Sequence, residues 1–526
     1  MVQLLYMYVK SDKSGIKNGE FNFSNEFQVH YDCNKGLSDG LTIKQNKNDS
    51  LSNLYNQTIS NITLLVGRNG TGKTSLLNAL FFSDFTKKDQ DSSKFFKVYH
   101  VKSNIFYMVG TFDISYNKGG SNFSWNYNGT FFRYDFETAD IEEIKENDEL
   151  DMDILWLKSP ISRDIKSSEE KKVIFSSNTE KNTISDNNFE IRPDVLERLS
   201  TLFTLNQNSP EVISCSLEFR LNYDRNAKNQ LQKIYGGDGD YRKSHLKALF
   251  KKSEDKSILY KLSFLERIYL NFILEIGIPN LSNTASADNL VDRCDIMIEI
   301  LTRAYDDGKI TINVLPVLDF MQYVFHKKII FGLESDLKRF SFEIDSKEII
   351  DELTKCVDIN ECISLQYWMS DGQSVFIDLF SKIGYFIKYA TSNNCIILID
   401  EPDAGMHPEW SRNLINNLTI ITNSINKNVQ FIMTTHSPYI ITDVPRENVY
   451  TLERDTGGIK VRQIQKSFAA NIYTLSSANN FFMNFPMGEF ARKKVLDSSI
   501  KKILDIVDDE LLQVLIKRRI NIDQDK

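Results

Sequence analysis

Residues 67–74 constrain what this chain can fold into more than any other part of its sequence. They read Gly-Arg-Asn-Gly-Thr-Gly-Lys-Thr, the pattern of a loop that binds phosphate. The apolar run 62–66 before the loop predicts a buried strand, and residues 75–80 after it predict the first turns of a helix. A loop placed between strand and helix points backbone N–H groups and the helix dipole at an anion. The segment therefore predicts a nucleoside triphosphate site, against the alternative of a chance glycine-rich turn.

The residues of this loop differ in what they are expected to bind. Lys73 is expected to reach the outer phosphates and to act in catalysis, and the Thr74 hydroxyl is expected to ligate Mg²⁺. The predicted ligands are thus ATP and Mg²⁺. The predicted nucleotide-binding residues of the loop are Gly67, Arg68, Asn69, Gly70, Thr71, Gly72, Lys73, Thr74 and Ser75.

Two acidic residues follow a second apolar run late in the chain. Asp400 and Glu401 come directly after residues 395–399, which predict a buried strand. The carboxyl ends of parallel strands meet at one edge of a sheet, where ligands bind. We expect Asp400 to hold Mg²⁺ and Glu401 to orient and deprotonate the attacking water as general base. The alternative is an ordinary buried strand that ends in acidic residues.

A histidine follows the next apolar run, residues 429–435. Because this strand comes directly after the one that carries the carboxylates, we expect His436 near the terminal phosphate. A neutral imidazole there would sense or polarise that phosphate. The alternative is a histidine with a structural role. Earlier in the chain, Ser370 and Gln373 form a capping box, which predicts a helix from there to about Tyr389.

Composition narrows the class of protein. The net charge of −8 argues against a protein that coats nucleic acid along its whole surface. The six cysteines include no C-x-x-C pair, which favours reduced thiols over a disulfide framework or a zinc site. The N-terminus lacks a basic leader and predicts a first strand, and no apolar run approaches the length of a membrane span. These features predict a cytoplasmic protein without a membrane partner.

The remaining patterns assign elements along the chain. Residues 116–130 predict a surface hairpin or loop, the acidic run 142–153 predicts a solvated helix face, and residues 185–340 have helical spacing, with 258–276 and 289–305 as examples. Residues 448–461 predict a hairpin. Strands are predicted at 2–10, 26–32, 40–45, 95–101, 105–114 and 171–177.

Two charged segments have open or weak interpretations. The basic segment 242–256 is either a solvated helix face or a patch for nucleic acid or a partner. Residues 46–49 match a guanine-reading pattern, but they precede the phosphate loop, so we interpret the match as chance.

Together the elements predict an α/β fold: a mixed or parallel sheet with flanking helices and an antiparallel N-terminal sheet. The long separation of Lys73 from Asp400 predicts an inserted domain between two halves of one nucleotide-binding domain. The predicted divisions are an N-terminal half with the phosphate loop at 1–184, a helical insertion at 185–340, a C-terminal half at 341–466 and a short helical tail at 467–526.

The ordered set of motifs resembles the ABC-type P-loop ATPase head. The motifs are GRNGTGKT at 67–74, SDGQ at 370–373, CIILIDEP at 395–402 and TTHSP at 434–438. More narrowly, the chain is similar to the SMC/RecF-like branch and, within it, to the OLD-like and PtuA-like ATPases of bacterial anti-phage defence, which are Septu- or retron-associated. Residues 402–408 are like the "EPE…LHP" run of that group, and short tail segments from Phe468 to Ala491 are similar to PtuA-like proteins. The tail lacks the acidic pattern of a fused Toprim nuclease.

The resemblance implies that such heads work as pairs, as a homodimer or higher oligomer held by ATP. The helix that begins near Ser370, with Gly372 and Gln373, would bind the γ-phosphate held by the other subunit. His407 would lie at the contact between the two heads, in the place of the usual aspartate. The alternative interpretation is that His407 is an exposed loop residue.

The resemblance also implies a biological role. It predicts an ATP-hydrolysing sensor or regulator of a separately encoded effector nuclease, with an HNH-type nuclease as one candidate. One alternative is a repair or recombination ATPase of the RecF/SMC type that clamps DNA directly. Another is a nucleotide-held scaffold in which turnover has no role.

Overall fold

The structure is a computed structural model that divides into two units, each described by itself. One unit comprises Met1–Glu190 and Phe386–Lys526, and the other comprises Ile191–Tyr385. The described residues are 2–12, 14–35, 40–46, 54–81, 94–111, 115–118, 121–124, 129–144, 150–158, 175–176, 193, 195–206, 213–218, 303, 306–307, 316, 319–320, 323, 330–333, 339–344, 347–355, 364–367, 371–423, 425–472 and 475.

The first unit contains a seven-stranded, mostly parallel sheet. Its five central strands run parallel, and the two edge strands, β13 and β21, pair antiparallel with their neighbours. Every residue of β18 and β19 is buried, which explains why these strands read as continuous apolar runs. The spatial order is β13 (Phe175–Ser176), β12 (Asp153–Leu157), β18 (Asn394–Asp400), β19 (Asn428–Thr435), β5 (Ile59–Gly67), β20 (Val449–Asp455) and β21 (Gly458–Gln463).

A six-stranded antiparallel sheet forms the other layer of this unit, as the sequence predicts for the N-terminal region. Its order is β11 (Ile141–Ile144), β10 (Thr130–Tyr134), β7 (Ile105–Gly110), β6 (Lys94–Lys102), β1 (Gln3–Ser11) and β2 (Lys17–Asn22). Aromatic side chains, including Tyr8, Phe96 and Phe106, fill the core on one side of it. Two further hairpins are β3 (Phe27–Tyr31) with β4 (Leu41–Gln45), and β8 (Ser115–Lys118) with β9 (Ser121–Ser124).

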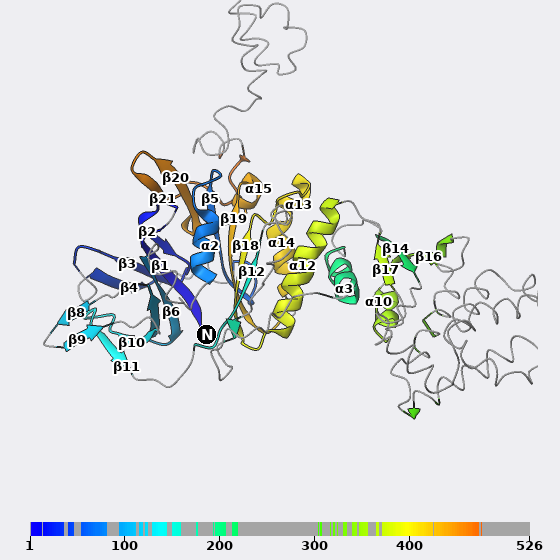
Figure 1. Ribbon diagram of the computed structural model, residues 1–526, viewed down its shortest axis with the longest axis horizontal. Coiled ribbons are helices and arrows are strands. Elements are labelled where there is room, and N and C mark those ends of the chain that lie inside the picture. Colours follow the sequence, from blue (N-terminus) through cyan, green and yellow to red (C-terminus); the bar gives the residue numbers. More distant parts are fainter. Residues whose placement is uncertain are drawn as a thin grey trace, which may run out of the picture. The chain divides into compact units, whose positions relative to one another are not determined.

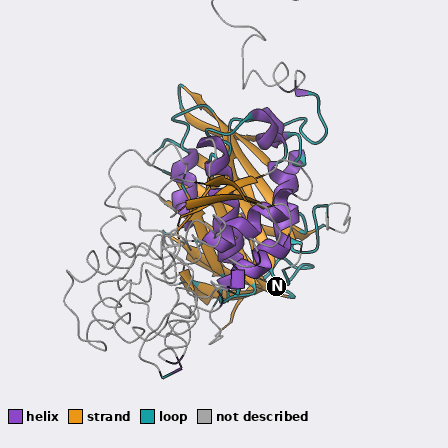
Figure 2. Cartoon of the chain, turned by 90° about the vertical axis from the view of Figure 1, so that its right-hand side faces the viewer, coloured by secondary structure: helices purple, strands orange, loops and turns teal. Residues whose placement is uncertain are grey.

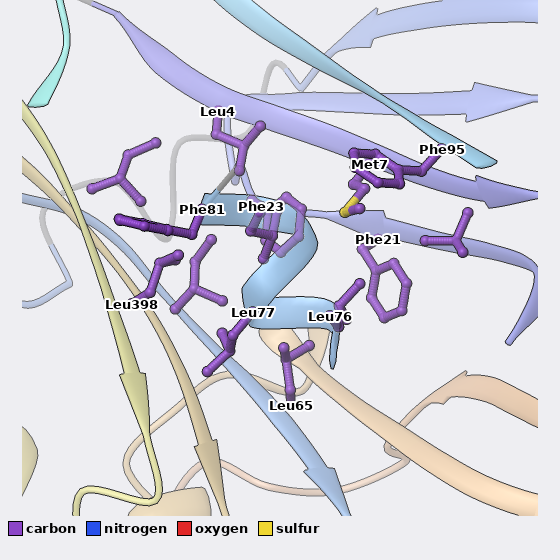
Figure 3. Close-up of a cluster of buried hydrophobic side chains, with 14 of the residues drawn as sticks. Leu4, Met7, Phe21, Phe23, Leu65, Leu76, Leu77, Phe81, Phe95 and Leu398 are labelled. Atoms are coloured by element: carbon purple, nitrogen blue, oxygen red, sulfur yellow. The ribbon is translucent and has the colours of Figure 1, made fainter. Parts of the chain in front are cut away.

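The helix after the phosphate loop, α2 (Lys73–Phe81), lies between the two sheets (Figure 1). Leu76, Leu77 and Phe81 of this helix are buried in one continuous apolar cluster. Burying each of these side chains contributes roughly 1.5–3 kcal/mol. The phosphate loop is therefore anchored at its C-terminal end by a helix packed on two sides. Figure 3 shows the neighbours of these α2 side chains. They include Met7, Phe21 and Phe95 from the antiparallel sheet and Leu65 and Leu398 from the seven-stranded sheet.

Buried amides join the start of β1 to the seven-stranded sheet. The Gln430 side chain accepts from the Leu4 N–H at 3.1 Å and donates to the carbonyls of Leu4 at 2.9 Å and Phe23 at 2.7 Å. Asn394 accepts from the Val2 N–H, and Asn428 donates to the Val2 carbonyl. These side chains satisfy backbone groups that the burial of β1 removes from water.

We expect Gln430→Leu to lower the free energy of unfolding by about 2–4 kcal/mol, because it removes the side-chain partner of the buried Leu4 N–H and carbonyl. The Phe23 carbonyl keeps the Asn61 amide as a donor. Urea unfolding followed by tryptophan fluorescence measures the change. Gln28→Leu, on the exposed side of β3, is the matched control and should stay within about 0.5 kcal/mol of the parent. Equal losses in the two variants would contradict the bridging role.

The remaining helices of the first unit follow the sheet strands. They are α13 (Pro408–Arg412), α14 (Leu414–Thr422), α15 (Pro438–Ile441) and the 3-10 turn η3 (Arg446–Asn448). Figure 2 distinguishes the helices (purple) from the strands (orange) beside which they pack. Among the described helices, none has the length and apolar character that crossing a membrane requires.

The second unit adds a sheet that the sequence pattern did not predict. Four antiparallel strands have the order β15 (Ile330–Leu333), β16 (Arg339–Ile344), β14 (Ile213–Glu218) and β17 (Ser364–Tyr367). Its helices include α3 (Val195–Asn206), α10 (Lys347–Thr354) and α12 (Asp371–Tyr389), whose last residues belong to the first unit. The helix predicted after Ser370 is confirmed as α12.

Two predicted assignments are wrong and several strands were missed. Residues 185–340 were expected to be helical, but β14, β15 and the start of β16 lie in that range. The acidic run 142–153 was expected to be a helix face, but it contains most of strand β11 and the first residue of β12. β11 pairs with β10, and its Glu142 carboxylate lies 3.2 Å from the Arg133 guanidinium across the strands. β12 and the polar strand β2 were not predicted. β12 depends on pairing with β18, about 240 residues later, and β2 has too few apolar residues to be read as a strand, although it pairs with the adjacent β1. The basic segment 242–256, the segment 258–276 and nearly all of 289–305 lie outside the described residues.

Candidate active site

The topology of the seven-stranded sheet brings the carboxyl ends of β5, β18 and β19 together. β19 lies beside β5 on one side and β20 lies beside β5 on the other, so the chain order reverses at β5. Such a reversal leaves an opening beyond the carboxyl ends of the strands, where α/β proteins bind ligands. Thr435 pairs with Val66, and Asp400 pairs with Thr434. The phosphate loop, the acidic pair and the histidine therefore meet at the same sheet edge.

The phosphate loop turns sharply between β5 and α2. Gly70 and Gly72 have φ values of 79° and 84°, in the left-handed region that favours glycine. The Thr71 hydroxyl and N–H both donate to the Arg68 carbonyl, at 2.8 and 3.3 Å, which closes the turn from within. Arg68, Asn69, Thr74 and Ser75 are exposed, so this side of the loop faces solvent.

Lys73 is folded back onto the loop that precedes it. Its ammonium donates to the carbonyls of Gly67 at 2.7 Å and Arg68 at 3.3 Å and lies 2.9 Å from His436 Nε2. The side chain is 5% exposed. Burial lowers the pKa of Lys73, and the carboxylates of Glu401 and Asp400 act in the opposite direction. To reach a phosphate, Lys73 has to give up its carbonyl partners.

Asp400 is held by hydroxyl groups from two elements. Thr74 donates to its Oδ2 at 2.9 Å, and Thr434 donates to its Oδ1 at 2.6 Å. A threonine hydroxyl and a carboxylate are hard oxygen donors of the kind that Mg²⁺ prefers. The residues present thus fit a Mg²⁺ site formed by Thr74 and Asp400.

Glu401 has an unusual backbone conformation. Its φ of 48° is in the left-handed region, which costs a residue with a side chain of order 1 kcal/mol. Its N–H donates to the hydroxyl of Thr434 at 2.9 Å and to the Thr434 carbonyl at 3.2 Å. These two contacts hold the turn that aims the Glu401 carboxylate toward His436.

His436 lies between Lys73 and Glu401 and contacts both through one atom. Its Nε2 is 2.9 Å from Lys73 Nζ and 3.2 Å from Glu401 Oε1. An ammonium only donates and a carboxylate only accepts, so Nε2 can satisfy one of them at a time. Removal of Lys73 toward a phosphate would allow Nε2–H to donate to Glu401. The hydrogen-bond partner of His436 Nε2 therefore depends on the position of Lys73.

Sequence analysis missed Asp403, which contacts the histidine turn. Asp403 Oδ1 accepts from the Thr435 hydroxyl at 2.9 Å, and that hydroxyl accepts from the Ser437 N–H at 2.9 Å. Burial raises the pKa of Asp403, while the bond from Thr435 lowers it. The paired threonines at the end of β19 were the available signal, because a hydroxyl at a strand end often bonds a nearby turn.

The pKa of His436 can be tested directly. Burial lowers it below the ordinary value, and the Lys73 charge lowers it further, whereas Glu401 acts to raise it. We expect the ring, in the protein without nucleotide, to gain its proton at a lower pH than a free histidine does. Histidine NMR over a pH series measures the midpoint.

Lys73→Met should raise that midpoint, since it removes a like charge beside the ring. Lys460→Met, on the exposed β21, is the matched control and should leave it unchanged. A midpoint above that of a free histidine in the parent protein would contradict the assignment.

Some predicted residues are not placed at this site. Gly372 and Gln373 lie in the first turn of α12, within the second unit, and Ser370 lies outside the described residues. His407 is exposed and caps α13, with its Nδ1 accepting from the Glu409 N–H at 3.3 Å. Its ring contacts Trp410 at 6.3 Å between centroids. The structure thus assigns His407 a local capping role.

Short parts of the chain are similar in sequence to two curated retron proteins. The chain is 32% identical over 92 residues to the "Retron Ec83 probable ATPase" of Escherichia coli, which covers 16% of this chain and 16% of that protein. It is 28% identical over 126 residues to the "Retron Vc95 probable ATPase" of Vibrio cholerae serotype O1 biovar El Tor, which covers 22% and 24%. The matches thus span less than a quarter of either relative.

Solved structures of SMC heads also match. A Smc head domain with an extended coiled coil, bound to the C-terminal domain of ScpA and derived from Pyrococcus furiosus, matches with a TM-score of 0.30 and 11% identity over 88% of this chain and 96% of that chain. The SMC head domain from Thermotoga maritima matches with a TM-score of 0.25 and 9% identity over 88% and 100%.

A family model covers most of the chain. The model of the AAA ATPase domain, AAA_15, matches residues 50–441. The match begins before the phosphate loop and ends just after His436, so it includes every strand end that builds the site. The chain therefore belongs to the AAA ATPase domain family and is a nucleotide-binding ATPase.

Proposed function

We propose that this ATPase binds and hydrolyses ATP at the edge of the seven-stranded sheet, and that it uses this cycle to control a separately encoded effector nuclease in anti-phage defence. The observation that carries the site is the meeting of Lys73, Glu401 and His436 around one atom, His436 Nε2. The defence role rests on the likeness to the two retron ATPases.

In this proposal each residue has one task. Lys73 leaves the carbonyls of Gly67 and Arg68 and binds the outer phosphates, while Thr74 and Asp400 hold Mg²⁺, which supplies positive charge next to them. Glu401 takes the proton of the attacking water, as a general base within reach of the terminal phosphate. His436 stays neutral, contacts Glu401 and polarises the terminal phosphate.

Head-to-head pairing completes the site. The first residues of α12, with Gly372 and Gln373, would present N–H groups and the positive helix end to the phosphate held by the partner subunit. Ser370 would add its hydroxyl, and His407 would lie at the contact between subunits. ATP then stabilises the dimer, because it binds more tightly when the second head completes the site.

Mass measurements on the hydrolysis-deficient Glu401→Gln variant test the pairing. With ATP and Mg²⁺ we expect a dimer, and without nucleotide we expect a monomer. Combining it with Gly372→Arg, which places a bulky side chain at the start of α12, should keep the protein monomeric while ATP still binds. A dimer that forms equally well without ATP would argue against ATP as the link.

The effector role calls for purification from cells that carry the native neighbouring genes. We expect the tagged protein, isolated with ATP and Mg²⁺, to bring a stoichiometric nuclease with it, and we expect those cells to resist phage. Lys73→Ala should abolish resistance. Recovery of an ATP-dependent dimer that retains DNA and no second protein would instead favour the clamp of a repair ATPase.

A further inference from the structure

Two segments from outside the phosphate loop close around its tip. In the turn between β1 and β2, Ser14 lies directly against the loop: a side-chain carbon at Gly72 would be 2.2 Å from Ser14 Oγ. The same turn contacts the hairpin of β20 and β21, because the Ile459 N–H donates to the Gly15 carbonyl at 2.9 Å. The hairpin reaches back to the loop through Arg454, whose Nη2 donates to the Gly70 carbonyl at 2.7 Å.

We propose that Arg454 is a positioning residue for nucleotide binding: it holds the Gly70–Thr71 peptide in the orientation that the phosphate loop needs. This peptide is fixed at both ends. Its carbonyl accepts from Arg454, and its N–H donates to the Arg68 carbonyl at 3.3 Å. The proposal rests on the proposed nucleotide site, and it stands whether or not the effector role is correct.

The orientation of this peptide matters because of where it lies. It directly precedes Gly72, Lys73 and Thr74, whose backbone N–H groups open helix α2 and are the groups that bind phosphate in such loops. With a φ of 79°, Gly70 has no side chain to restrict rotation of the peptide that follows. A fixed partner for its carbonyl removes that freedom before nucleotide arrives, so less entropy is lost on binding.

The charges around Arg454 favour this role over a surface ion pair. Its sequence neighbour Asp455 pairs with Lys460 at 2.5 Å, and Glu453 lies 4.0 Å from Arg462. Among the described residues, the Arg454 side chain donates its hydrogen bond to the Gly70 carbonyl. The hairpin itself is held in register by β20 pairing with β5, where Leu452 lies beside Gly67. Arg454 therefore extends from a rigid base.

Affinities of ATP and ADP, measured by calorimetry with Mg²⁺, test the proposal together with the turnover rate at saturating ATP. Arg454→Ala should weaken both nucleotides by a similar factor, about fivefold, the loss expected for one charge-assisted hydrogen bond at an exposed site. The saturated rate should stay within about twofold, because Lys73, Glu401 and His436 are unchanged. Arg454→Lys keeps one donor for the single carbonyl and should recover most of the loss.

Arg462→Ala is the matched control, since it removes an exposed arginine from the partner strand β21 of the same hairpin. It should leave both affinities unchanged. Equal losses in Arg462→Ala, a loss confined to ATP, or no loss in Arg454→Ala would each overturn the proposal; a loss confined to ATP would instead assign Arg454 to the terminal phosphate. Lys73→Ala separates the two ideas: if it binds ATP as well as the parent does, the proposed nucleotide site itself fails.

Discussion

Replacing Glu401 by glutamine should lower the rate of ATP turnover by about 100-fold to 10,000-fold, the range that a general base contributes. The amide has nearly the same shape as the carboxylate but cannot accept the proton of water. The backbone bonds from Glu401 to Thr434 do not involve the side chain, so the turn should persist. ATP should therefore bind with nearly unchanged affinity, and the variant should accumulate in the ATP-bound form. Phosphate release and calorimetry measure the two effects.

Glu409→Gln, on the exposed α13, is the matched control and should turn over ATP at the parent rate. Undiminished turnover in Glu401→Gln would mean that another group acts as the base. The same variant distinguishes two roles in cells. If Glu401→Gln keeps full phage resistance while Lys73→Ala loses it, ATP binding is sufficient and the protein acts as a scaffold held by nucleotide.

Replacing Lys73 by alanine should weaken ATP binding by about 100-fold, the loss expected when two charge-assisted hydrogen bonds to phosphate, of roughly 1.5 kcal/mol each, are removed. Turnover should fall below detection at ordinary ATP concentrations. In the protein without nucleotide, the same change removes the partner that the Gly67 carbonyl has at 2.7 Å. Fluorescent-nucleotide titration measures the affinity.

Lys460→Ala is the control for removal of a lysine near the loop without removal of a phosphate ligand. It lies on the exposed β21, and its loss should leave the affinity within about twofold of the parent. An affinity within twofold for Lys73→Ala as well would show that ATP binds elsewhere, and it would remove the basis for every role proposed at this sheet edge.

The sequence by itself determined the parts of this protein whose chemistry is local. A buried strand, a glycine-rich turn and a helix start are encoded within a few residues of one another, so residues 62–80 predicted β5, the phosphate loop and α2. The same holds for β18 and β19, whose continuous apolar runs reflect burial on both faces. The order of the motifs then predicted that Thr74, Asp400 and His436 share one sheet edge, since parallel strands end together.

Only the tertiary structure decided what depends on partners far away in the chain. β12 pairs with β18, about 240 residues later, and the four-stranded sheet of the second unit pairs β14 with strands more than a hundred residues later. Gln430 has no local signal for its contacts with Leu4 and Phe23. The left-handed backbone of Glu401, the shared Nε2 of His436 and the reach of Arg454 to Gly70 arise for the same reason. Each depends on hydrogen bonds between groups on different elements, and a short run of neighbouring residues does not contain both groups.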